Sequence, residues 1–262
     1  FDGAAVRDFN GRFRAELARL APLLDRRAEA GHVRRGHGDL HLRNICVVEG
    51  EPVLFDCLEF NEELGTTDVL YDLAFLLMDL CHRGLEDFAN LVMNRYLDIT
   101  GDEEGLPALP FFMAVRAAVR AHVGATAATG AGPQADDLGA AARRYFELAL
   151  DLLRPRTPRL LAVGGLSGSG KSTVAAAVAA AIGPRPGART LSSDRLRKRL
   201  FSVAPETRLP AEAYDEAVSE KVYRTMAERS AAVLGCGHGV VVDATFERGE
   251  ERARIEAVAR AA

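Results

Sequence analysis

A glycine-rich segment in the second half of the chain has the residue types and spacing needed to hold phosphate groups. Its sequence, Gly165-Leu-Ser-Gly-Ser-Gly-Lys171-Ser172, fits G-x-x-x-x-G-K-[ST] and lies between a short apolar stretch and an Ala/Val-rich stretch. Because glycine has no Cβ, the main-chain N–H groups of such a turn can surround a phosphate, and the following helix adds its N-terminal dipole. Lys171 would neutralise the β- and γ-phosphates, and the Ser172 hydroxyl would bind Mg²⁺. The segment therefore predicts a P-loop that binds ATP or GTP.

The predicted nucleotide-binding set combines the turn glycines, the lysine and the hydroxyl side chains among and after them. Its members are Gly165, Ser167, Gly168, Ser169, Gly170, Lys171, Ser172 and Thr173. A glycine-rich turn without a ligand is the alternative interpretation, and the flanking strand and helix patterns count against it. We expect ATP and Mg²⁺ as the cofactors.

Two further motifs place carboxylates after apolar stretches of the same half. Ser192-Ser-Asp194-Arg-Leu-Arg197 follows one stretch, and Val240-Val-Val-Asp243 ends another. In an open parallel sheet, ligands gather beyond the carboxyl ends of the strands, so both motifs should face the P-loop cleft. We expect Asp243 to hold Mg²⁺ through water, with a turn residue at the strand end as the alternative.

Asp194 and Arg197 are the candidate catalytic pair of this half, together with Lys171. The Asp194 carboxylate could accept the proton of an attacking hydroxyl, and Arg197 could clamp an anionic group or the charge of the transition state. Alternatively, Asp194 caps the helix that follows it, a common role for Asp at such a position. One carboxylate could fill both roles.

The first half of the chain contains a second set of residues suited to phosphoryl transfer. His37-Gly-Asp39-Leu-His-Leu-Arg-Asn44 contains D-x-x-x-x-N, and Leu54-Phe-Asp56 follows after a predicted hairpin. In kinase-like chemistry the first Asp takes the proton of the substrate hydroxyl, while the Asn and the second Asp hold Mg²⁺. Asp39 is thus a candidate base, and Asn44 and Asp56 are candidate metal ligands. The alternative is purely structural, with His37 as a buried hydrogen-bonding residue.

Apolar spacing predicts that this half is mainly helical. Apolar residues at intervals of three and four predict a first helix, and Gly or Pro separates the later ones. A hairpin is expected from Ile45–Val48 and 53–55, with residues 49–52 in its turn. The predicted helices cover residues 6–30, 68–80, 85–99, 109–123 and 135–153.

A linker and a change of pattern divide the chain. Residues 154–159 hold two prolines and three arginines, a composition typical of an interdomain linker. After it, strands alternate with helices, which implies crossover connections and a parallel sheet. The expected strands are 160–163, 189–192 and 239–243, and the expected helices are 171–182, 211–234 and 248 onward. We predict an α/β chain in which a mainly helical domain, 1–153, precedes a parallel-sheet P-loop domain, 160–262.

Composition narrows the range of partners. The 262 residues include 33 Lys and Arg against 37 Asp and Glu, and the net charge of −4 provides no field for an extended nucleic-acid surface. The four cysteines are scattered, which favours reduced thiols over a zinc site or disulfides. No apolar run approaches the roughly 20 residues that span a bilayer. We therefore expect a cytoplasmic protein whose partners are a nucleotide and a small hydroxyl-bearing substrate.

Residues 160–262 resemble the small P-loop kinases that include polynucleotide kinase, zeta toxin, and gluconate- and chloramphenicol-type kinases. The P-loop, the Ser-Ser-Asp194-Arg-Leu-Arg197 segment and Val-Val-Val-Asp243-Ala-Thr carry this resemblance. It implies that Asp194 is the substrate-activating Asp and that Arg197 is the Arg following it by three. Such kinases also carry arginines on a lid placed later in the chain, and no segment of this sequence corresponds to that lid.

Residues 1–153 are similar to the C-terminal lobe of aminoglycoside and choline-type phosphotransferases. The H-G-D-x-H-x-x-N loop is matched at every fixed position from His37 to Asn44. The resemblance implies that Asp72 braces this loop from the following helix. It also implies an N-terminal lobe with a Gly-rich loop and an ATP-contacting Lys, which this sequence does not contain, so this half either works with residues preceding Phe1 or serves as a scaffold.

Together the two halves look like a bacterial fused protein of the AAA-type predicted-kinase class. The leading hypothesis is an ATP- and Mg²⁺-dependent kinase that transfers the γ-phosphate to a hydroxyl of a small molecule or a nucleic-acid terminus. One alternative is a nucleotide-gated binding module that hydrolyses ATP to reset its conformation. Another is drug modification by the first half, as in aminoglycoside inactivation.

Overall fold

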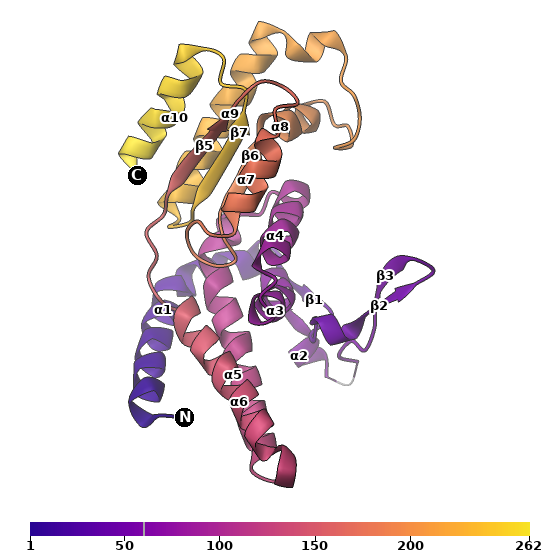
Figure 1. Ribbon diagram of the computed structural model, residues 1–262, viewed down its shortest axis with the longest axis vertical. Helices are drawn as coiled ribbons and strands as arrows, with labels where there is room; N and C mark the ends of the chain where they lie inside the picture. Colours follow the sequence, from indigo (N-terminus) through magenta and orange to yellow (C-terminus); the bar gives the residue numbers. More distant parts are fainter. Residues whose placement is uncertain (60) are drawn as a thin grey trace. The chain divides into compact units, whose positions relative to one another are not determined.

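The computed structural model describes residues 1–59 and 61–262, and the chain divides into two compact units (Figure 1). The first unit comprises Phe1–Met93 and Gly105–Pro155, and the second comprises Asn94–Glu104 and Arg156–Ala262. The change of unit at residue 155 lies within the expected linker. The inclusion of Asn94–Glu104 in the second unit was not anticipated from the sequence.

The first unit is mainly helical, with two short antiparallel strand pairs. Its elements are α1 (Gly3–Glu29), β1 (Val33–Arg35), η1 (Leu42–Asn44), β2 (Ile45–Val48), β3 (Glu51–Leu54), α2 (Glu62–Gly65), β4 (Thr66–Asp68), α3 (Val69–His82), α5 (Leu109–Ala128), η3 (Gly132–Gln134) and α6 (Ala135–Leu152). The 3₁₀ turn η2 (Glu103–Ala108) begins in the second unit and ends in this one. Helix α4 (Glu86–Thr100) begins in this unit and ends in the second. Helix α5 packs against both α3 and α6, and buried apolar residues of α3 and α5 form much of the core.

Asp68 begins α3 and joins it to α1. Its Oδ1 accepts a hydrogen bond from the N–H of Leu70, the N-cap arrangement that satisfies a free donor of the first turn. Both of its oxygens also accept bonds from the Arg27 guanidinium, at 2.7 and 2.9 Å, and both side chains are buried. Removing one partner of such a pair would leave a buried charge uncompensated.

The predicted hairpin is present, but its turn is shorter than expected. Glu49 and Gly50 form the turn with φ of 54° and 87°, the positive values of a type I′ turn, whose twist suits the flanking strands. Pro52 is therefore a strand residue opposite Val47, not a turn residue as predicted. Pairing of β1 with β4 joins segments 33 residues apart and had no local signal in the sequence.

The second unit confirms the predicted parallel sheet. Strand β7 (Val240–Ala244) lies between β5 (Leu160–Gly164) and β6 (Arg189–Ser192) and pairs in parallel with each (Figure 1). Its helical elements are α7 (Lys171–Ala179), α8 (Ser193–Leu200), η4 (Ala211–Tyr214), α9 (Glu216–Gly235) and α10 (Gly249–Ala261). Every residue of β7 is buried, as expected for the middle strand.

The strand register sets the position of the site. Asp243 near the end of β7 pairs with Val163 of β5 and with Ser192 of β6. The P-loop after β5 and the Asp194 segment after β6 therefore leave the sheet at the same edge as Asp243. Small residues allow α7 to pack closely behind this edge, where Ala175 and Ala179 are fully buried against Val241.

The helix predicted over residues 211–234 is divided in two. Asp215, with ψ of 154°, separates the 3₁₀ turn η4 from α9, because an extended residue cannot continue the helical hydrogen bonding. Among the helices of the described residues, none combines the length and apolar character needed to cross a membrane.

Candidate active site

The P-loop has the closed turn that its glycines predict. Gly165, Gly168 and Gly170 have φ of 154°, 76° and 83°, which side chains with a Cβ rarely adopt. A Cβ on Gly165 would lie 2.8 Å from Ser169 Oγ, and the N–H of Ser169 donates to the carbonyl of Leu166 at 3.2 Å. The glycines are therefore required by the backbone path itself.

Lys171 and Ser172 stand at the N-terminus of α7, directly after this turn. Gly170 is the N-cap and offers no side chain, so the first-turn N–H groups of α7 have no side-chain acceptor. Free N–H groups and the helix dipole favour an anion at this position. Lys171 Nζ donates to the carbonyl of Leu166 at 3.3 Å, which places its charge over the same turn.

Ser172 and Asp243 meet at the centre of the site. The Ser172 hydroxyl donates to Asp243 Oδ2 at 2.6 Å, and Asp243 is only 3% exposed. Its other oxygen, Oδ1, is buried without a hydrogen-bond partner among the described residues. A buried carboxylate with a free oxygen beside a hydroxyl fits a bound Mg²⁺, which prefers such oxygen ligands and keeps several waters.

Tyr223 of α9 supports the loop after Asp243, a role that was not predicted from the sequence. Its hydroxyl lies 3.1 Å from Thr245 Oγ1 and accepts a bond from the N–H of Phe246 at 3.2 Å. Phe246 has φ of 51°, so the loop turns sharply here. A tyrosine within a long helix carries no distinctive pattern, so only the structure reveals this contact.

Asp194 lies in the first turn of α8 and is 54% exposed. Its carboxylate forms an ion pair with Lys198 at 2.8 Å, one helical turn further on. The N-cap of α8 is Ser192 and no side chain caps this terminus, so the capping role considered for Asp194 is not realised. The carboxylate remains accessible at the edge of the sheet where the P-loop begins.

Arg197 differs from the prediction. Its side chain is 7% exposed and its guanidinium donates to the carbonyl of Ala213 and to Ser219 Oγ. It also lies 4.9 Å from the centre of the Tyr214 ring. These contacts tie α8 to η4 and α9, so the interpretation of Arg197 as a free clamp for an anion is corrected to a buried structural role.

The edge strand β6 is covered by the end of α4, also within the second unit. The Asn94 side chain accepts from the N–H of Thr190 at 2.7 Å and donates to the carbonyl of Ala188 at 3.1 Å. It thus satisfies main-chain groups that an edge strand leaves unpaired. Arg189, 1% exposed, forms ion pairs with Asp98 at 2.7 Å and Glu103 at 3.0 Å.

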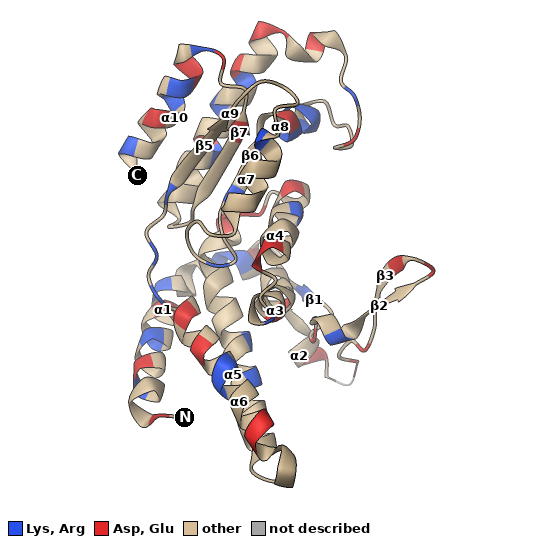
Figure 2. Cartoon of the chain, viewed as in Figure 1, with Lys and Arg blue, Asp and Glu red and all other residues tan. Residues whose placement is uncertain are grey.

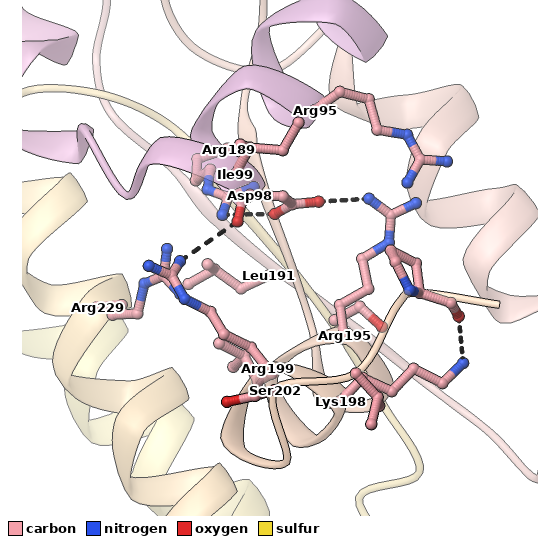
Figure 3. A pocket seen from close by; sticks show the side chains of 14 residues that line it. Arg95, Asp98, Ile99, Arg189, Leu191, Arg195, Lys198, Arg199, Ser202 and Arg229 are labelled. Atoms are coloured by element: carbon pink, nitrogen blue, oxygen red, sulfur yellow. Dashed lines mark hydrogen bonds and ion pairs between the residues drawn. The ribbon is translucent and has the colours of Figure 1, made fainter. Parts of the chain in front are cut away.

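A cavity of about 640 Å³ adjoins this contact. Figure 3 shows Asp98 between Arg189 and Arg195, with Arg199 and Arg229 also directed towards the cavity. Because Asp98 and Glu103 form ion pairs with most of these arginines, the charges serve mainly to hold Asn94–Glu104 against the other elements of the second unit.

In the first unit, Asp72 braces the loop as the resemblance implied. Its carboxylate accepts from the N–H groups of His37 at 2.7 Å and Gly38 at 3.0 Å. A Cβ on Gly36 would lie 2.7 Å from this carboxylate, which explains the glycine there. Arg116 of α5, which the sequence did not indicate, donates to the carbonyl of Gly38 at 3.0 Å.

Asp39 is held by two side chains of its own loop. Asn44 Nδ2 donates to Asp39 Oδ2 at 3.0 Å. His41 Nδ1 accepts from the N–H of Arg43, so a neutral ring carries its proton on Nε2, which faces Asp39 Oδ2 at 3.3 Å. Burial lowers the pKa of His41, and the nearby Arg120 adds to this effect while Asp39 opposes it. The neutral imidazole and the Asn44 amide therefore both hold Oδ2 of this carboxylate.

The proposed metal ligands of this unit are brought near each other by the main chain. The N–H of Phe55 donates to the carbonyl of Asn44 at 3.1 Å, so Asp56 follows a residue bonded to Asn44. Asp56 is exposed, with φ of 60°. The Asn44 side chain bonds Asp39 through its nitrogen, and not through its amide oxygen. His37 Nε2 lies 2.9 Å from the carbonyl of Phe55 and ties the two segments together.

The described residues contain no larger metal-binding cluster. Among residues 1–59 and 61–262, no group of three or more His, Cys, Asp and Glu side chains is arranged to hold a metal ion. Both candidate Mg²⁺ sites therefore have few protein ligands. Such sites are usual for Mg²⁺ that is bound mainly through nucleotide phosphates and water.

Comparison with known proteins supports the division into two modules. Residues 2–112 match the phosphotransferase enzyme family, and residues 160–262 match the AAA domain family. These matches confirm the predicted two-module organisation, with kinase-like domains of a phosphotransferase and nucleotide-binding type.

Similar curated proteins come from mycobacteria. Uncharacterized proteins Rv2004c of Mycobacterium tuberculosis and Mb2027c of Mycobacterium bovis are each 36% identical over 231 residues, or 87% of this chain. The aligned region covers 45% of each relative, so the chain spans about half the length of the curated relatives it matches. No solved structure shows a significant match.

Proposed function

We propose that the second unit is an ATP- and Mg²⁺-dependent kinase that transfers the γ-phosphoryl group to a hydroxyl of a small molecule or a nucleic-acid terminus. The observation that carries this proposal is the hydrogen bond from Ser172 to the buried Asp243 beside the uncapped N-terminus of α7. A glycine turn without a ligand would not need a buried carboxylate with an unpartnered oxygen at the same point.

The residues of this unit divide the work between binding and proton transfer. The N–H groups of the P-loop, Lys171 and the N-terminus of α7 bind the phosphates. Ser172 and Asp243 would hold Mg²⁺, which supplies neutralisation of the β- and γ-phosphate charge. Asp194 accepts the proton of the acceptor hydroxyl while the hydroxyl oxygen bonds to the γ-phosphorus of ATP. The bond from the γ-phosphorus to the bridging β-phosphate oxygen breaks, and ADP leaves. Asp194 is half exposed at the sheet edge that it shares with the P-loop, so an acceptor hydroxyl can reach its carboxylate.

A second candidate function belongs to the first unit. Asp72, Asn44 and His41 together fix Asp39, the arrangement needed for a base that receives a hydroxyl proton. We propose that this unit is a phosphotransferase in the longer protein, with Asn44 and Asp56 as its Mg²⁺ ligands. An inert scaffold would not require an oriented carboxylate at this position.

Variants can separate the two sites. Asp194→Ala should abolish phosphate transfer to the acceptor while leaving Mg-ATP binding intact, and Asp39→Ala should affect only transfer by the first unit. Candidate hydroxyl compounds incubated with Mg-ATP would be screened by mass spectrometry for the added phosphate. ATP turnover with no phosphorylated acceptor would favour the nucleotide-gated module instead.

We place this activity in the cytoplasm, in line with four free cysteines.

A further inference from the structure

A cavity in the first unit, unrelated to the P-loop, is surrounded by arginines. It measures about 480 Å³ and has apolar walls from α5 and α6, including Val123, Ala127 and Leu138. Its charged lining consists of Arg43, Arg83, Arg120 and Arg144. Figure 2 shows basic segments side by side on α5 and α6, two helices that pack along each other.

Most of this positive charge has no acidic partner. Among the described residues, the side chains of Arg43, Arg120 and Arg144 form no ion pair within 4 Å. Arg83 does contact Asp79 at 3.2 Å, but Asp79 is buried and its Oδ2 also accepts from the N–H of Leu42. Like charges held close together by packed helices repel each other, so an anion in the cavity would stabilise this arrangement.

The cavity also offers a flat aromatic surface. His82 and Tyr145 stack with ring centres 3.6 Å apart and planes 11° apart, and Arg120 lies 5.7 Å from the Tyr145 ring centre. Burial lowers the pKa of His82, Asp79 opposes this, and Arg144 adds to it. The neutral stack can therefore pack against an apolar or planar group without adding to the positive charge.

The cavity adjoins the loop that carries Asp39. Arg43 belongs to η1, between Asp39 and Asn44, and its side chain lines the cavity. The charge of Arg120 also acts on His41, whose ring faces Asp39. A ligand in the cavity would thus contact Arg43 of the loop that carries Asp39.

We propose that this cavity binds a small anion whose phosphate or carboxylate group is held by Arg43, Arg120 and Arg144 and whose apolar or planar part lies against the His82–Tyr145 stack. A guanidinium matches the planar geometry of both oxyanions. A polycationic ligand such as an aminoglycoside is disfavoured by the same arginines. The inference is independent of the function proposed for the P-loop unit.

Calorimetric titration of the full chain with phenyl phosphate and with benzoate tests the proposal. Benzylamine, a cation with the same ring, serves as the comparison ligand. We expect binding of at least one anion and none of benzylamine, with affinity falling at least fivefold in each of Arg120→Gln and Arg144→Gln. Arg143→Gln is the matched control, because Arg143 is an exposed neighbour on α6 that does not line the cavity; it should bind as the unchanged protein does.

The P-loop is a competing phosphate site, so each titration is repeated in Lys171→Ala. Binding that persists in this variant supports the cavity. Binding that disappears in it, or that Arg120→Gln and Arg144→Gln leave unchanged while circular dichroism shows a native fold, would overturn the proposal. Absence of binding by both anions to the unchanged protein would overturn it as well.

Discussion

Ser172 donates a hydrogen bond to Asp243 at 2.6 Å, although 71 residues separate them in the sequence. The parallel pairing of β5 with β7 makes this contact, because Gly164 and Ala244 end their strands side by side. One residue comes from the helix that follows the P-loop and the other from a buried strand. The Mg-nucleotide site proposed above depends on this contact between two separate sequence motifs.

The Asp243→Asn variant tests the metal role of this pair. Asparagine keeps an oxygen that can accept from Ser172, but it removes the charge that attracts Mg²⁺. We expect Mg²⁺ to tighten ATP binding to the unchanged protein and to have little effect in the variant, measured by calorimetry with and without Mg²⁺. Asp87→Asn, at an exposed site on α4, should retain the Mg²⁺ effect. Equal Mg²⁺ dependence in both variants would contradict the assignment.

Lys171→Ala should weaken nucleotide binding without unfolding the chain. Charge-assisted hydrogen bonds contribute about 1.5–3 kcal/mol, so a loss of roughly ten- to hundredfold in ATP affinity is expected. Among the described residues, Lys171 Nζ bonds only to the carbonyl of Leu166, so the melting temperature should change little. Lys221→Ala, on the exposed face of α9, is the control for removal of a lysine. An unchanged dissociation constant in Lys171→Ala would remove the P-loop from the binding site.

Residues within one contiguous motif were the most predictable part of the site. The P-loop glycines and the helix after them follow from short-range rules, since positive φ and a helix N-terminus are local properties. The edge shared by Asp243 and the P-loop also agreed with expectation, because parallel strands align their carboxyl ends. The brace from Asp72 agreed with what the resemblance to the phosphotransferases implied.

Roles that depend on distant partners were not predictable. Arg197 occupies the motif position of an anion clamp, but its partners Ala213 and Ser219 lie 16 and 22 residues away, beyond any local pattern. Asn94 at the end of α4 bonds to Ala188 and Thr190 next to and within β6, at sequence separations of 94 and 96 positions. Such contacts are decided by which polar groups must be satisfied on burial, and sequence spacing does not report them.

Asn94→Ala should destabilise the second unit. The amide satisfies two main-chain groups of the edge strand, and an unsatisfied buried group costs about 1–3 kcal/mol. Urea unfolding should show a lower midpoint for this variant, and Asn10→Ala, at an exposed site on α1, should be neutral within about 0.5 kcal/mol. An unchanged midpoint for Asn94→Ala would mean that water replaces the amide at no cost.

His238 should make folding pH-dependent. Its ring is fully buried, and burial lowers its pKa to about 4, although a hydrogen bond to the carbonyl of Gly187 opposes the shift. An unfolded histidine has a pKa near 6.5, so between these values the unfolded state binds more protons. The contribution of the neutral ring to the free energy of unfolding is therefore fully present above about pH 6.5. It is lost as the pH falls towards 4, by on the order of 3 kcal/mol.

His238→Gln removes the titrating ring and should flatten this dependence. The difference in unfolding free energy between the unchanged protein and the variant should shrink as the pH falls from 7.5 to 5. Over this range His238 gains a proton in the unfolded state but stays neutral in the folded state, so only the unchanged protein loses stability through this residue. Urea unfolding at several pH values measures it. His122→Gln, at an exposed site on α5, controls for loss of a histidine and should follow the unchanged protein at every pH. A difference that stays constant with pH would show that the ring is solvated or charged in the folded chain.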